Sequence, residues 1–183
     1  MLHVEEQHKT EQSILCPTNP YAATKAGAEM IAQAYNHSFK MPIIITRGNN
    51  VYGKNQYPEK LIPLFIKQLQ YDEPVTTQGD GSQVRAFLHV DDVSQAFQKI
   101  LEEGKIGEIY NIGSNQEHSG LDIAHTLIKM VKGVDKKECE KWIKYIDDRP
   151  FNDKRYYINN EKLKKLGWKP KIEFETALKQ LFS

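Results

Sequence analysis

The run Pro42-Ile43-Ile44-Ile45-Thr46 limits the possible fold more than any other feature of the chain. Consecutive β-branched apolar residues are typical of a parallel strand that is covered on both faces. A predicted helix precedes this strand, and predicted strands and helices alternate after it. The sequence therefore predicts the α/β class.

The other elements follow from apolar periodicity and from the positions of glycine and proline. We expect helices over residues 20–39, 58–70, 92–104, 121–131, 160–166 and 174–182, and strands over residues 42–46, 84–90, 107–112 and 142–146. Residues 47–53 and 76–82 are predicted as turns, and residues 147–157 as a loop. Asp91 is expected to cap the helix that follows it. Because residues 47–53 follow a parallel strand, we expect them to open onto a ligand cleft.

Composition excludes several classes of protein. With 183 residues, of which 39% are hydrophobic and 27% charged, the chain can bury a core of ordinary size. Its net charge is only +1, so we expect neither nucleic acid nor an anionic membrane as a partner. No apolar run approaches the ~18 residues of a membrane span. The distant Cys16 and Cys139 and the absence of histidine pairs at i, i+4 predict no metal site and a reduced, cytoplasmic setting.

A tyrosine and a lysine lie four residues apart at the start of the first predicted helix, Tyr21 and Lys25. Asn19 is a favourable N-cap and Pro20 suits the first helical position. At 3.6 residues per turn, the two side chains project from one face and can reach one ligand. A lysine ammonium beside a phenol favours the phenolate, which can act as a general base near neutral pH. Alone, such a pair is a weak signal, because it arises by chance on many helices.

The 183 residues contain no G-x-G-x-x-G fingerprint for binding a dinucleotide. Gly79-Asp80-Gly81 comes closest, but we predict it in a turn that does not join a strand to a helix. An enzyme that used Tyr21 and Lys25 with a nicotinamide cofactor would need such a phosphate-binding turn.

Several spaced segments resemble one enzyme family. Pro17-Thr18-Asn19-Pro20-Tyr21-Ala22-Ala23-Thr24-Lys25 is similar to the catalytic segment of extended short-chain dehydrogenase/reductases, and more narrowly of nucleoside-diphosphate-glucose 4,6-dehydratases. Residues 46–53, 58–63, 79–85, 89–93 and 110–113 resemble further segments of these enzymes. Residues 148–156, with Arg-Pro-Phe-Asn-Asp, are the most selective match and, together with residues 162–168, look closest to the UDP-glucose dehydratase modules of rhamnose synthesis. The resemblance extends over nearly the entire chain.

This resemblance implies an incomplete Rossmann-like parallel sheet with a small α/β substrate-binding subdomain. Residues 1–15 are then a polar N-terminal segment, and residues 16–183 the C-terminal part of an extended short-chain dehydrogenase/reductase. Tyr21 and Lys25 are implied as catalytic residues, and Tyr21, Lys25 and Val51 as contacts of NAD. The implied contacts of the nucleotide-sugar are Asn50, Lys60, Leu61, Arg85, Arg149 and Asn152. Arginine suits the diphosphate, because its planar fork binds phosphate oxygens bidentately.

The family's reaction is an internal redox cycle on UDP-glucose or dTDP-glucose. Tyrosinate removes the proton of the C4 hydroxyl while NAD⁺ accepts the C4 hydride, an Asp/Glu pair then eliminates water across C5 and C6, and the hydride returns to C6. The residues before Tyr21 lack the Thr-Asp-Glu context of that pair. We therefore expect a C-terminal fragment, or a split or truncated product, that is inactive alone. The family also implies a homodimer.

Alternatives remain at this point. The same scaffold serves sugar-nucleotide epimerases and decarboxylases, although the segment 149–153 argues against them. A non-catalytic nucleotide-sugar-binding remnant, or a module that supplies this half to a partner, fits the missing glycine-rich turn. Gly120 stands where bacterial relatives tend to have an asparagine that contacts the nucleotide. The choice between a UDP-sugar and a dTDP-sugar as substrate therefore stays open. Without the resemblance, Arg85 and Arg149 would be surface residues and Asn50 a turn residue.

Overall fold

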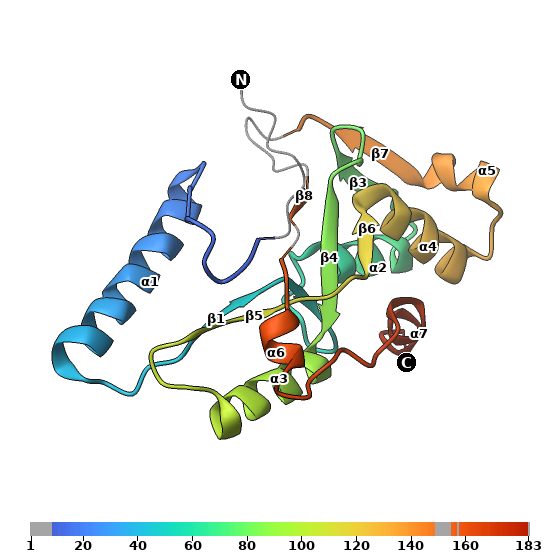
Figure 1. The fold of residues 1–183 in the computed structure, drawn as a ribbon. Coiled ribbons are helices and arrows are strands. Elements are labelled where there is room, and N and C mark those ends of the chain that lie inside the picture. The colour runs from blue at the N-terminus through green and yellow to red at the C-terminus, as the bar shows by residue number, and fades with distance from the viewer. Residues whose placement is uncertain (1–8, 149–154, 157, 183) are drawn as a thin grey trace.

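The computed structural model describes residues 9–148, 155–156 and 158–182. These residues form helices packed around short strands (Figure 1). Strand pairing among them is mainly parallel, and the exception is the antiparallel pair of β4 (Val84–His89) with β6 (Glu117–Ser119). The α/β class predicted from the sequence is confirmed.

The first part of the chain holds a long helix and a two-stranded parallel sheet. Helix α1 (Pro20–Phe39) leads to β1 (Ile45–Gly48), which pairs in parallel with β5 (Ile109–Ile112). The strand predicted at residues 42–46 thus begins and ends later than expected. Ile43 to Arg47 are only half buried, so the expected cover on both faces is incomplete.

A second sheet is built around β4, and the sequence does not predict all of it. β2 (Asn50–Tyr52) pairs in parallel with β4 and lies within the predicted turn 47–53. β6 is not predicted, and β8 (Arg155–Tyr156) pairs with β4 inside the predicted loop 147–157. These strands are two or three residues long, so their hydrogen bonds to β4 create them more than any local pattern does.

A third, parallel pair joins β3 (Val75–Gln78) to β7 (Ile143–Ile146). The predicted turn at 76–82 is correct only from Gly79 onward. Around these sheets lie α2 (Leu61–Gln70), α4 (Gly120–Lys132), the short α5 (Lys136–Cys139) with a 3₁₀ turn (Glu140–Trp142), α6 (Glu161–Lys164) and α7 (Phe174–Gln180).

Helix α3 (Val90–Glu103) begins earlier than expected, and its cap is not Asp91. The N-cap is His89, whose Nδ1 accepts a hydrogen bond from the Asp91 N–H at 3.3 Å. Asp91 instead lies in the first turn, where a carboxylate interacts favourably with the helix dipole. The predicted end of the helix at Gly104 is confirmed.

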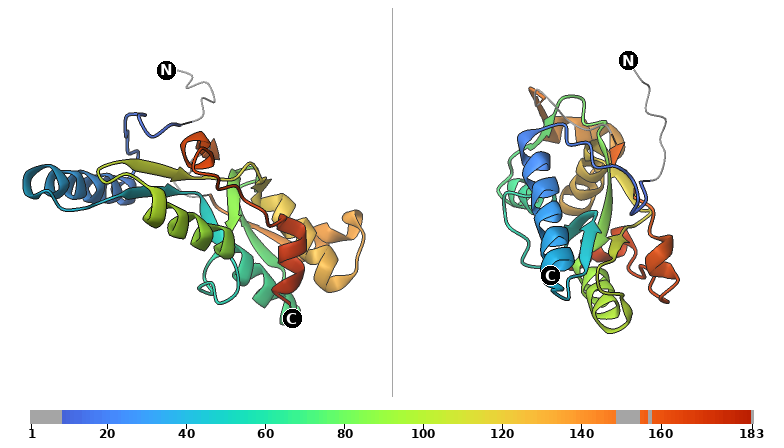
Figure 2. Two further views of the ribbon diagram at one scale, coloured as in Figure 1. Left: turned by 60° about the horizontal axis from the view of Figure 1, so that its bottom comes forward. Right: turned by 60° about the vertical axis from the view of Figure 1, so that its left-hand side comes forward.

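Two apolar clusters form the core. The larger lies where α2, α4 and α7 cover β2–β4, and its largest fully buried side chains are Tyr52, Phe65 and Phe174. The smaller joins α3, β5 and α6 through Leu88, Ile100, Tyr110, Ile112, Leu163 and Trp168. Helix α1 belongs to neither cluster, and Figure 2 shows it reaching away from the other helices. Within the described residues, no helix combines the length and apolarity needed to cross a bilayer.

Candidate functional site

Tyr21 and Lys25 lie on one side of the first turns of α1. The helix starts where the sequence predicts, because the Asn19 Oδ1 accepts a hydrogen bond from the Ala22 N–H at 2.8 Å and Pro20 occupies the first turn. Tyr21 is 74% exposed, and Lys25 is also exposed. Both functional groups are therefore open to a ligand arriving from solvent, and their catalytic roles stay predictions.

Asn50 and Val51 lie on β2, next to β4, which carries Arg85. Asn50 is in register with Phe87 and Val51 with Leu88. Because side chains alternate along a strand, Asn50, Phe87 and Arg85 face the same side of this sheet. The fold thus brings together two of the residues predicted to bind the nucleotide-sugar, although the segment that holds Asn50 is a strand.

The other predicted substrate residues with described positions gather around the turn at Gly81. Lys60 and Leu61 stand at the start of α2, and both are exposed. The Gly81 carbonyl accepts a hydrogen bond from the Leu121 N–H at 3.1 Å, which fixes the start of α4 against the turn. A Cβ placed on Gly120 would lie 4.0 Å from Leu61 Cδ1, so the starts of α2 and α4 meet at this turn.

The turn itself requires glycine. Gly81 has a φ of +70°, and a Cβ there would lie 2.6 Å from Thr77 Cγ2. Since β4 begins three residues later, this turn sets where Arg85 enters the sheet. Arg85 is half buried, and its Nη1 donates to the Val84 carbonyl at 2.8 Å.

Arg149 and Asn152, also predicted to bind the nucleotide-sugar, lie outside the described residues. The described residues that flank this segment, Asp148 and Arg155, both lie near the start of β4. Asp148 accepts a hydrogen bond from Gln83 Nε2 at 3.0 Å, and Arg155 is in register with Val84. The chain therefore leaves and re-enters the described part close to Arg85.

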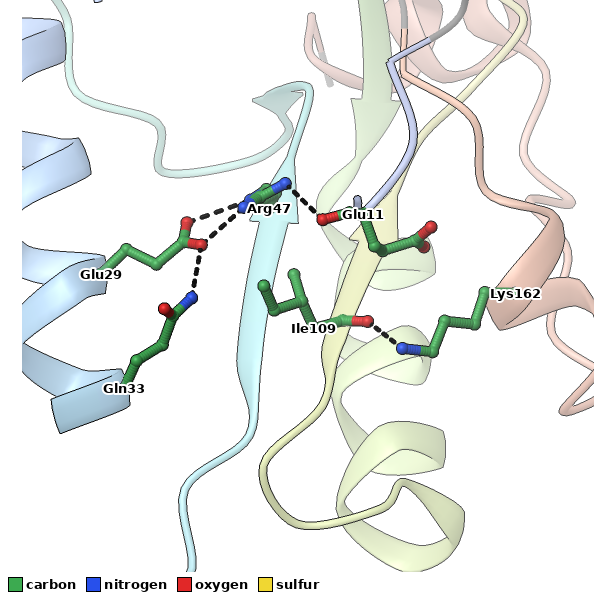
Figure 3. Close-up of polar contacts among 6 residues, drawn as sticks. All are labelled: Glu11, Glu29, Gln33, Arg47, Ile109 and Lys162. Carbon is green, nitrogen blue, oxygen red and sulfur yellow. Dashed lines mark hydrogen bonds and ion pairs between the residues drawn. The ribbon is translucent and has the colours of Figure 1, made fainter. Parts of the chain in front are cut away.

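Sequence reasoning missed a polar cluster beside α1. Arg47, next to the carboxyl end of β1, donates two hydrogen bonds to the Glu29 carboxylate on α1, and a third to the Glu11 carbonyl (Figure 3). Glu29 follows Tyr21 and Lys25 at helical spacing, and this spacing is the one feature of the sequence that could have pointed to Glu29. Its partner lies 18 residues away, and no local pattern indicates the pairing.

One cavity among the described residues lies away from this site. A cavity of ≈ 510 Å³ opens between β6 and α7, with His118, Glu173 and Phe174 in its wall. The His118 and Phe174 rings stack with centroids 4.0 Å apart, and burial lowers the pKa of His118 despite nearby carboxylates. None of its lining residues is predicted to bind or react, and we assign it no role.

The residues predicted to contact NAD are all accessible to a ligand. Tyr21 and Lys25 are exposed on one side of α1, and Val51 is 38% exposed on β2. The glycine-rich turn that would cradle the pyrophosphate is not in the 183 residues. Among the described residues, no group of three or more His, Cys, Asp or Glu side chains could hold a metal ion.

Comparisons with known proteins agree on one family. A family model described as GDP-mannose 4,6 dehydratase matches residues 3–181. The chain is 48% identical to a bovine dTDP-D-glucose 4,6-dehydratase over 171 residues, which are 93% of this chain and 48% of the relative. It is also 48% identical over 170 residues to a trifunctional Arabidopsis thaliana enzyme with UDP-glucose 4,6-dehydratase activity in its name, of which it covers 25%.

Solved structures give the same result. The dTDP-glucose 4,6-dehydratase of Bacillus anthracis, determined in complex with NAD, aligns with a TM-score of 0.88 and 40% identity. The alignment covers 97% of this chain and 55% of that one. The chain thus spans about half the length of the single-activity relatives that it matches.

Proposed function

The chain belongs to the GDP-mannose 4,6-dehydratase family, and from this we propose that it supplies the catalytic helix and the nucleotide-sugar-binding part of an NAD-dependent 4,6-dehydratase. The substrate we propose is UDP-glucose or dTDP-glucose. The observation that carries the proposal is 48% identity to a dTDP-D-glucose 4,6-dehydratase over 93% of the chain. Domain limits follow it: residues 1–15 as an N-terminal segment, residues 16–183 as the C-terminal part of such an enzyme.

In this proposal Tyr21 is the base and Lys25 its partner. The phenolate would take the proton of the C4 hydroxyl, and the Lys25 ammonium would stabilise the phenolate and bond a ribose hydroxyl. NAD⁺, when bound, would supply the hydride acceptor. Support comes from the exposure of both residues on one side of α1.

The nucleotide-sugar would lie along β4 and the turn at Gly81. We propose that Arg85 and Lys60 hold the diphosphate, and that Asn50 and Leu61 contact the nucleotide-sugar nearby. Arg149 and Asn152 complete the set on the strength of the sequence resemblance. A diphosphate carries two or more negative charges, and cations beside the turn and the starts of two helices suit it.

We include a cytoplasmic location and a homodimer in the same proposal. The two cysteines are free, which agrees with a reducing, cytoplasmic location. Large apolar side chains on the outer side of α1, such as Tyr35 and Phe39, agree with a homodimer.

Nucleotide-sugar binding is measurable on the chain alone. Isothermal titration calorimetry with UDP-glucose and dTDP-glucose should show binding that Lys60→Met weakens about tenfold, since a charged contact of ~1.4 kcal/mol is lost. Lys67→Met, at the other end of α2, is the matched control and should leave the affinity unchanged. Equal affinity in the two variants would remove Lys60 from the site.

Catalysis needs the rest of the enzyme. The chain with NAD⁺ and either sugar should give no 4-keto-6-deoxy product, because its 183 residues lack the phosphate turn and the Thr-Asp-Glu segment. A chimera in which the chain replaces the aligned segment of the bovine relative should turn over dTDP-glucose. Tyr21→Phe should lower kcat of this chimera by about 100-fold or more. Full activity of that variant would refute the role of Tyr21, and a 4-epimer as product would favour the epimerase alternative.

A further inference from the structure

Helix α1 is not held in place by apolar packing in the part of the chain that the structure describes. It buries none of its 20 residues. The partly buried positions carry small or polar side chains such as Ala22, Ala26, Glu29 and Asn36. Its large apolar side chains point outward, with Ile31 62% and Phe39 70% exposed. A helix is normally fixed on a sheet by its apolar face, so another contact must set the position of α1.

That contact is the ion pair of Glu29 with Arg47. Arg47 Nε donates to Glu29 Oε2 at 3.0 Å, and Nη2 donates to Oε1 at 2.5 Å (Figure 3). The Glu29 side chain is 11% exposed and the Arg47 side chain 18% exposed. Two parallel bonds fix the angle as well as the distance between the groups. The pair therefore joins α1 to β1 in one defined geometry.

Glu29 shares a helix side with the proposed catalytic pair. It lies four residues beyond Lys25 and eight beyond Tyr21, which is about 6 Å and about 12 Å along the axis. An α-helix transmits rotation and translation over such distances with little loss. Fixing Glu29 therefore fixes both the height and the rotation of Tyr21 and Lys25.

Arg47 also forms a hydrogen bond to the segment around Glu11, on the side away from Glu29 (Figure 3). Its Nη1 donates to the Glu11 carbonyl at 3.1 Å, and the Glu11 carboxylate accepts from the Asn111 N–H on β5 at 3.1 Å. Glu11 is only 9% exposed. The Lys9 carbonyl accepts from the Asn111 side chain at 3.1 Å and from the Asn159 N–H at 2.9 Å. The residues around Glu11 thus tie the guanidinium to β5, and the helix to the sheet through it.

We propose that Arg47 is the positioning residue of the Tyr21/Lys25 pair. Its fork, set between Glu29 on α1 and the Glu11 main chain, holds the helix at the height and rotation that the reaction needs. The catalytic part of this inference, that the position of α1 matters for the reaction, rests on the proposed function. The mechanical part, that Arg47 sets the place of α1, stands without it.

The mechanical part is tested on the chain alone. Spin labels at Ala28→Cys on α1 and Gln98→Cys on α3, in a Cys16→Ser background, report the distance between the two helices by pulsed electron paramagnetic resonance. Arg47→Met should shift or broaden this distance by about 1 Å or more, a displacement that can cost about 100-fold in rate. Arg47→Lys keeps the charge but not the fork, so it should recover the distance only in part.

Lys162→Met is the matched control. Lys162 ties α6 to the other side of the same sheet, by hydrogen bonds to Glu108 at 2.5 Å and to the Ile109 carbonyl (Figure 3). This variant loses a single, more exposed ion pair at the same sheet and should leave the distance from α1 to α3 unchanged. An unchanged distance in Arg47→Met, or the same change in both variants, would overturn the inference.

The catalytic part is tested in the chimera with the bovine relative. Arg47→Met should lower kcat by about 10- to 100-fold and leave KM for dTDP-glucose within about twofold, because the proposed sugar contacts with described positions are held by the pairing of β2 with β4 and by the start of α2. Lys162→Met should change neither constant. An equal fall of kcat in both variants would mean that Arg47 serves stability alone. Full activity in Tyr21→Phe would instead defeat the proposed function, and the spin-label distance would still decide the mechanical part.

Discussion

Helices α1 and α4 both begin at a well-formed cap, and they differ in what holds them afterwards. Asn19 caps α1, and Ser119 caps α4 with a reciprocal bond from its own N–H to Asp122. Helix α4 buries Ile123, Ala124, Leu127 and Ile128, whereas α1 buries no residue. A cap decides that a helix forms and where it starts. Burial decides where in the molecule it lies, and around α1 a polar pair has taken over that task.

The largest test of this contrast compares two phenylalanines. Phe65 on α2 lies 2% exposed in the core that α4 covers, and Phe39 on α1 is 70% exposed. Phe65→Ala should lower the free energy of unfolding in urea by about 3–5 kcal/mol. Phe39→Ala should change it by less than about 0.5 kcal/mol. A large effect at Phe39 would show that the outer side of α1 is covered in solution.

The second test compares two glycines in the left-handed region. Gly81 and Gly133 have φ of +70° and +65°, but only at Gly81 would an added Cβ meet other atoms within 4 Å. Gly133→Ala should cost about 1 kcal/mol, and Gly81→Ala about 2–3 kcal/mol because Thr77 must also move. Gly81→Ala should in addition weaken UDP-glucose binding in calorimetry. Equal costs would mean that the turn is looser than its contacts indicate.

A smaller effect is expected at the two caps. Asn19→Ala and Ser119→Ala should each cost about 1 kcal/mol of local stability. Hydrogen exchange should rise in the first turn of α1, around Tyr21, since neither core cluster of the described residues includes a residue of that turn. In α4 the buried face should keep the first turn protected. The same increase in both helices would contradict the proposed difference in burial.

The smallest effect is on pH dependence. Burial holds the pKa of His118 below its ordinary value of 6.5. Below about pH 6.5 the unfolded chain binds a proton that the folded chain does not, so the free energy of unfolding falls as the pH drops. His118→Gln should flatten this fall in urea titrations made between about pH 7 and pH 5. An unchanged slope would mean that other groups carry it.

These contrasts also show which features a sequence can predict. The predicted helix from Pro20 to Phe39 is correct, because the cap and the proline are local signals. β2, β3 and β6 are not predicted, because pairing with distant strands creates them. Asp91 has a side chain that favours the cap position, but the histidine two residues earlier makes the bond. Within the candidate site, the resemblance names Tyr21, Lys25 and Arg85, and their roles are still predictions.

The Arg47 cluster marks the limit of such reasoning. Glu29 alone resembles any exposed helical glutamate, and Arg47 stands in a predicted turn. Only the fold brings the guanidinium to a segment that lies 36 residues away in the sequence. Contacts of this kind depend on the crossing of a helix over a strand, and no local pattern encodes that geometry.

The two thiols of the molecule have opposite chemical accessibility. Cys16 is exposed three residues before the Asn19 cap, whereas Cys139 is buried and its thiol pKa is raised by desolvation and nearby carboxylates. The nucleophile in alkylation is the thiolate, so a maleimide should modify Cys16 long before Cys139. The native chain thus carries one selective attachment point at the base of α1, where a fluorophore could report ligand arrival without any substitution.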